Sequence, residues 1–66
     1  MVSKEEMINF LQYKLDKFMK EEKQFGFEER GVQRLFDEMI AQKEMVEALI
    51  CEPVNLGKDG KVTIGF

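Results

Sequence analysis

The chain has 66 residues, of which 44% are hydrophobic and 35% charged, and its net charge is −3. This composition is too apolar for a disordered tail, and the negative charge excludes a general positive field that would attract nucleic acid or an anionic membrane. A domain of this length buries only about 60% of the surface that its unfolded chain exposes. We therefore expect a single domain over residues 1–66 that gains stability from a partner.

Two signals mark the start of a first helix. Ser3 followed by Glu6 is a capping box, and Val2 with Met7 occupies the positions of a hydrophobic staple. From there the pattern predicts a helix from about residue 4 to about residue 24. Apolar residues recur along it at spacings of three and four, as in the buried stripe of an amphipathic helix: Ile8, Leu11, Leu15 and Phe18.

A second helical pattern follows Gly26, which suits the left-handed position just after a helix C-terminus. It predicts a helix from about residue 28 to about residue 50, although Gly31 is a poor helix former and could shift the start to that residue. The apolar stripe of this helix comprises Val32, Leu35, Phe36, Met39, Ile40, Val46, Leu49 and Ile50. Because the connection is short, we expect the two helices to lie antiparallel with their stripes facing each other.

The C-terminal residues have the pattern of a β-hairpin. Pro53 ends the second helix, since it lacks a backbone N–H and keeps the preceding residue extended. Lys58-Asp59-Gly60 is typical of a type I turn with Gly60 in the left-handed position. This loop defines three antiparallel pairs, which gather the apolar residues on one face: Val54 with Ile64, Asn55 with Thr63, and Leu56 with Val62. The predicted fold class is mainly α, an antiparallel two-helix hairpin followed by a short β-hairpin over about residues 53–66.

The residues that most enzymes and zinc proteins rely on are scarce in this chain. It has no histidine and a single cysteine, Cys51. A catalytic triad needs a base beside its nucleophile, and a zinc site needs clustered cysteine and histidine ligands, so neither is indicated within one chain. Glycine-rich phosphate loops and acidic calcium loops are also missing from the sequence. We expect a protein that is not an enzyme and has no cofactor.

The apolar stripes of both helices are wider than one neighbouring helix can cover. This surplus predicts an interface with another chain, formed by Phe10, Phe18, Phe36, Met39, Ile40 and Phe66. We expect a small interaction or regulatory protein that acts as a homo-oligomer of helical hairpins, with a dimer favoured and another protein as a second kind of partner. A signal peptide and a membrane span are both missing from the sequence, which predicts a cytoplasmic protein without a membrane partner.

Nucleic-acid binding is the alternative function. Arg30 and Arg34 lie one turn apart near the start of the second helix, and Lys14, Lys17 and Lys20 form a basic edge along the first. Arginines at a helix N-terminus can approach DNA. However, a helix-turn-helix reader normally has a third supporting helix, and this chain continues into a hairpin instead. Nucleic acid is therefore the less favoured partner.

Overall fold

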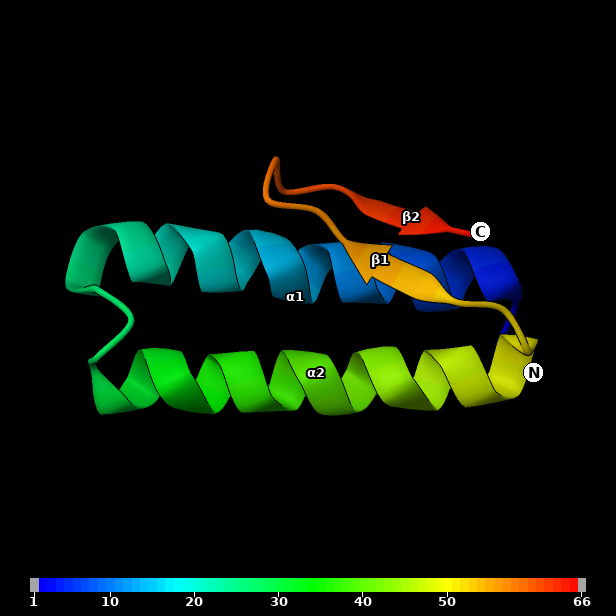
Figure 1. The fold of residues 1–66 in the computed structure, drawn as a ribbon, viewed down its shortest axis with the longest axis horizontal. Helices are drawn as coiled ribbons and strands as arrows, with labels where there is room; N and C mark the ends of the chain where they lie inside the picture. The colour runs from blue at the N-terminus through cyan, green and yellow to red at the C-terminus, as the bar shows by residue number, and fades with distance from the viewer. Residues whose placement is uncertain (1, 66) are drawn as a thin grey trace.

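The computed structural model describes residues 2–65, which form two long helices and a small two-stranded sheet. In chain order the elements are α1 (Lys4–Phe25), α2 (Arg30–Ile50), β1 (Val54–Leu56) and β2 (Val62–Ile64). The helices lie side by side and antiparallel, and the hairpin rests against one side of the pair (Figure 1). We call the side that the hairpin covers the front face and the opposite side the back face. The mainly α fold expected from the sequence is confirmed.

The first helix begins where the capping box predicts. Ser3 has an extended backbone, and its Oγ accepts a hydrogen bond from the Glu6 N–H at 3.1 Å. The helix continues to Phe25, one residue past the predicted end. Gly26 follows with φ +86° and ψ 154°, so the predicted positive φ is confirmed, but ψ is extended rather than left-handed helical. This conformation turns the chain sharply toward the second helix.

The second helix begins at Arg30, two residues after the expected start near Glu28. The difference arises because Glu29 acts as the N-cap: its backbone is extended, and its carboxylate accepts a hydrogen bond from the Val32 N–H at 3.1 Å. The helix ends at Ile50, as predicted. Cys51 then adopts the left-handed conformation, with φ 58° and ψ 35°, and its N–H bonds the Glu47 carbonyl. A residue with a Cβ thus occupies a position where glycine is usual.

The predicted register of the β-hairpin is confirmed. The structure pairs Val54 with Ile64, Asn55 with Thr63, and Leu56 with Val62. Gly60 has φ +85°, as the turn requires, and the Gly57 N–H donates to the Lys61 carbonyl at 2.9 Å. Phe66, predicted as an anchor and interface residue at the end of this hairpin, lies outside the described residues.

The core forms where the two helical stripes meet, and one hairpin residue joins it. Its buried side chains are all apolar: Leu11, Leu15, Phe18, Val32, Met39, Val46 and Val54. A fully buried side chain of this kind contributes about 1.5–3 kcal/mol of hydrophobic stabilisation. Val54 is the hairpin residue that belongs to this core, and the half-buried Leu56 and Val62 pack against the core. The hairpin is therefore bound to the helices by apolar burial on its inner face.

A glutamine side chain also holds the hairpin from α1. The Gln12 Oε1 accepts a hydrogen bond from the Val62 N–H at 3.0 Å, and its Nε2 donates to the Gly60 carbonyl at 2.6 Å. Residues advance by about 100° along a helix, so Gln12 lies on the flank of buried Leu11 that faces the hairpin. The Gln12 side-chain amide thus provides hydrogen-bond partners for an N–H on the outer edge of β2 and for a carbonyl in the turn before it.

We expect Gln12→Ala to lower the free energy of unfolding by about 1–3 kcal/mol, because it leaves the partly buried Val62 N–H without its acceptor. Urea denaturation followed by circular dichroism measures this loss. Gln24→Ala, at an exposed position of the same helix, is the matched control. Equal stability of the two variants would contradict the role assigned to Gln12.

We expect Cys51→Gly to be more stable than Cys51→Ala by about 1 kcal/mol, because glycine adopts a positive φ without a Cβ clash. Both variants remove the exposed thiol, so their difference isolates the backbone conformation. Thermal and urea denaturation measure it. If the alanine variant were at least as stable as the glycine variant, Cys51 would not be in the left-handed conformation in solution.

Candidate functional site

A groove runs along the front face between the hairpin and α2. Its floor is α1, one wall is the outer edge of β1 with the turn that follows, and the other wall is the middle of α2. The volume is about 600 Å³, inside the range of roughly 300–1,000 Å³ common for ligand sites. The apolar part of the lining comes from all three elements: Leu15, Phe18, Met19, Phe36, Met39, Ile40, Val54 and Leu56. We call this space the front groove.

Aromatic side chains build the groove near the turn between the helices. The rings of Phe18 and Phe36 pack with centroids 5.4 Å apart, and Phe27 from the turn packs edge-on against both. Such contacts are worth about 0.5–1.5 kcal/mol each beyond the area that they bury. Phe18 is 7% exposed, Phe36 is half-buried and Phe27 is exposed. Phe18 and Phe36 therefore give the groove a partly accessible aromatic lining, and Phe27 packs against both rings.

The backbone of β1 presents hydrogen-bonding groups to the groove. Antiparallel pairs alternate between bonded and non-bonded, and the Gly57–Lys61 and Gly65–Pro53 bonds set the phase of that alternation. The Val54–Ile64 and Leu56–Val62 pairs are consequently non-bonded, and the N–H and C=O groups of these residues point outward from the hairpin. On β1, outward means toward α2. Leu56 thus presents its N–H and C=O along the wall of the front groove.

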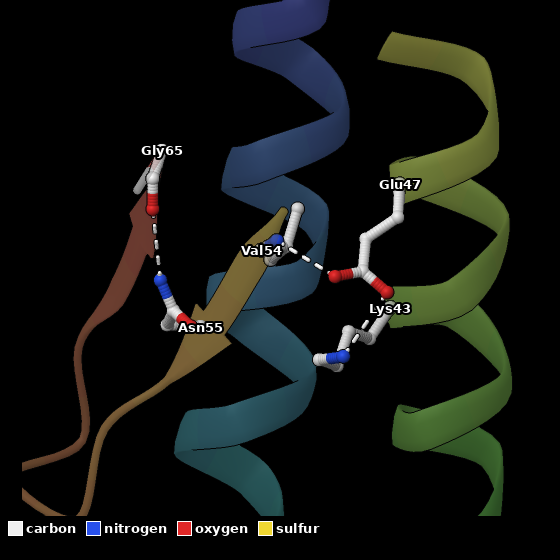
Figure 2. A network of polar contacts seen from close by, with 5 residues as sticks. All are labelled: Lys43, Glu47, Val54, Asn55 and Gly65. Carbon is white, nitrogen blue, oxygen red and sulfur yellow. Dashed lines mark hydrogen bonds and ion pairs between the residues drawn. The ribbon is translucent and has the colours of Figure 1, made fainter. Parts of the chain in front are cut away.

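A glutamate closes the groove at its other end. Figure 2 shows the Glu47 carboxylate between α2 and β1, where one oxygen accepts a hydrogen bond from the Val54 N–H at 2.8 Å and the other from the Lys43 ammonium at 3.0 Å. The Val54 N–H, and then Lys43, favour the charged carboxylate and hold the pKa of Glu47 below the usual glutamate value. Glu47 therefore has a structural role, because it binds the outer edge of the hairpin through the Val54 N–H.

The six residues predicted to form an interface lie on different parts of the molecule. Phe18, Phe36, Met39 and Ile40 line the front groove together. Met39 is only 2% exposed and belongs, with Phe18, to the core, so Phe36 and Ile40 offer the more accessible surface. Phe10 lies on the back face beside Met45, and Phe66 is outside the described residues. Whether any of them contacts a partner stays a prediction.

The basic residues of the alternative function do not form one patch. Lys20 follows buried Phe18 by two positions and Arg34 follows buried Val32 by two, so both point away from the contact between the helices. They therefore lie on opposite outer sides of the molecule. Lys14 forms an ion pair with Glu38 at 3.9 Å on the back face. The fold therefore does not bring the two arginines and the lysine edge onto one surface.

Sequence reasoning missed the two side chains that position the hairpin, Gln12 and Glu47. Both are polar residues at the margin of an apolar stripe, where a helical pattern alone suggests exposure to solvent. The available signal was the hairpin itself, since a two-stranded sheet has two outer edges that need partners. That signal indicates that such partners exist but not which residues they are.

Among residues 2–65, acidic residues and Cys51 form no group of three or more that could hold a metal ion, and Cys51 is exposed. Neither helix is long and apolar enough to cross a membrane. In comparisons with known proteins, the chain matches no protein-family model, no curated protein and no solved structure.

We expect the stability difference between the wild type and Glu47→Gln to depend on pH. Because folding lowers the pKa of Glu47, its stabilising contribution is complete above the pKa of an unfolded glutamate and is lost as the pH falls through the lower folded pKa. The wild type should exceed Glu47→Gln at neutral pH, and the gap should close in acid. Urea denaturation across this range measures the gap, and Glu44→Gln, an exposed position of α2, controls for the lost charge. A gap of constant size would refute the assignment.

Proposed function

We propose that this chain is a small, non-catalytic protein-binding protein, and that the front groove takes an extended segment of another protein. The observation that carries the proposal is the pairing of an apolar groove with the outward backbone groups of Leu56 on its wall. A segment that lies beside β1 gains backbone hydrogen bonds from the strand and apolar contact from the groove. Few other ligands use both features at once.

The dimensions of a sheet fit this arrangement. A third strand would lie about 4.8 Å from β1, on the side of α2, and its alternate side chains would point down into the groove. There they would meet Phe36 and Ile40, which are half-buried in the free chain. The bound segment would cover the part of α2 that the two-stranded hairpin leaves open. A partner segment with apolar residues at alternate positions therefore suits the groove best.

The hairpin of a second copy does not fit the same space. Each hairpin carries its own helices beneath it, since β1 contacts α2 and β2 contacts α1. If two copies paired through their β1 edges, a helix of one copy would occupy the volume that α2 of the other already fills. The favoured occupant is accordingly a single extended segment without a helical layer under it.

Selection of short peptides with alternating apolar and polar residues tests the proposal, followed by amide NMR spectra of the chain with a selected peptide. We expect the Leu56 amide signal to shift downfield as its N–H gains an acceptor, together with shifts at Phe36 and Ile40. Ile40→Lys should weaken binding at least tenfold, a loss of about 1.4 kcal/mol, because it places a charge at the apolar wall.

Met45→Lys is the matched control, since it adds the same charge to an exposed position of the same helix outside the groove. It should bind the peptide as the wild type does. Binders that leave the Leu56 amide unchanged, or that Ile40→Lys and Met45→Lys weaken equally, would rule out the front groove as the binding site.

A further inference from the structure

The back face carries large apolar side chains that are half or more exposed. Phe10 of α1 is 46% exposed, while Met45 and Leu49 of α2 are 50% and 63% exposed. Phe10 and Met45 line the same shallow hollow between the helices. The hairpin lies on the opposite face, because Gln12, which binds it, is on the other flank of Leu11 from Phe10. This patch is therefore left uncovered by the chain itself.

The exposed area of the chain is large for its mass. It exposes 5016 Å². A folded monomer of 7.8 kDa typically exposes about 4,400 Å². The excess of roughly 600 Å² approaches the 800 Å² or so that each partner buries in a standard protein interface. The chain thus exposes more surface than a compact monomer of its mass, as expected if part of that surface is buried against a second copy.

We propose that the back face is the interface of a homodimer in which the two helical pairs stack into a four-helix bundle. This inference goes beyond the groove-binding function and uses the opposite side of the molecule. The two-fold axis runs parallel to the helices, so α1 of one copy packs antiparallel on α2 of the other. Rotation about such an axis does not move a residue along the bundle. Residues at one position along the helices of one copy therefore face residues at the same position in the second copy; we call such a position a level.

The apolar levels match under this axis. With Lys14 paired to Glu38, Phe10 one turn from Lys14 and Met45 two turns from Glu38 lie within one turn of the same level, so Phe10 of each copy comes within reach of Met45 of the other. Leu49, one turn further along α2, extends the contact toward the end of the bundle. The Phe10 ring is already held in place, because the Lys14 ammonium lies 5.4 Å from its centroid. A two-fold axis thus buries all three exposed apolar side chains twice.

The charges of the back face match under the same axis. Lys14 pairs with Glu38 within the chain, which places both at one level near the middle of the helices. Because the axis preserves level, Lys14 of each copy also comes opposite Glu38 of the other copy. Because the interface is isologous, this pair forms twice. An arrangement that brings apolar residues onto apolar ones and Lys14 onto Glu38 is self-complementary.

The dimer would leave the two front grooves on opposite outer surfaces. Each copy has its hairpin on the face away from the interface, so both grooves stay open. A dimer could then bind two segments of one partner or bridge two partners, and linked binding raises the overall affinity without new contacts. The second copy therefore makes the groove bivalent.

Size-exclusion chromatography with light scattering tests the interface. We expect twice the 7.8 kDa mass of one chain at micromolar concentration. Met45→Lys should raise the dimer dissociation constant at least tenfold while peptide binding in the front groove is retained. Tyr13→Lys adds a charge at an exposed aromatic residue outside the hollow and should stay dimeric. A wild type with the mass of one chain at submillimolar concentration would overturn the dimer, whatever the groove binds.

A charge reversal tests the orientation. Lys14→Glu and Glu38→Lys each place like charges across the interface and should each weaken the dimer at least tenfold. Mixing the two variants restores opposite charges between copies, so a heterodimer should form with affinity near that of the wild type. A structural role within one chain predicts no rescue on mixing, and two variants that stay monomeric when mixed would refute the contact between Lys14 of one copy and Glu38 of the other.

Discussion

The two hydrogen bonds by which α1 and α2 hold the outer edges of the hairpin are the constraint on which the rest of the structure depends. Gln12 accepts the Val62 N–H, and Glu47 accepts the Val54 N–H. A two-stranded hairpin is marginal in water by itself. Here each helix supplies one side chain to one strand, so the hairpin has a fixed position across the helical pair as well as a buried inner face.

That fixed position creates the front groove. The strand β2 packs on α1, while β1 contacts α2 at Glu47 and leaves Phe36 and Ile40, in the middle of α2, half-buried. Glu47 satisfies the first outward N–H of β1 and not the second, since Leu56 lies two residues further along the strand. The groove and the open strand edge therefore have one common cause: Glu47 binds β1 at Val54 and leaves the rest of the strand edge open.

Local chemistry in the sequence was sufficient to predict the fold. Ser3 and Glu6 located the start of α1, and the turn at Gly60 determined the full strand register, because each depends on neighbouring residues alone. The start of α2 was predicted less well, because glutamate is not a usual N-cap residue and only the geometry of the turn makes Glu29 the cap.

The binding surfaces were less predictable than the elements. A helical stripe tells which residues are apolar but not which flank a later segment will cover. Phe10 and Ile40 were accordingly assigned to one interface, yet Ile40 lines the groove on the face that the hairpin covers, and Phe10 lies on the opposite face. The contribution of Gln12 and Glu47 depends on the same long-range placement.

Amide hydrogen exchange of the free chain tests the central claim most directly, because it reads three hairpin amides at once. We predict slow exchange at Val54 and Val62, whose N–H groups are held by Glu47 and Gln12, and much faster exchange at Leu56, whose N–H faces the groove. Protection of Leu56 equal to that of Val54 would mean that the edge of β1 is closed. Fast exchange at Val54 and Val62 would mean that the helices do not hold the hairpin.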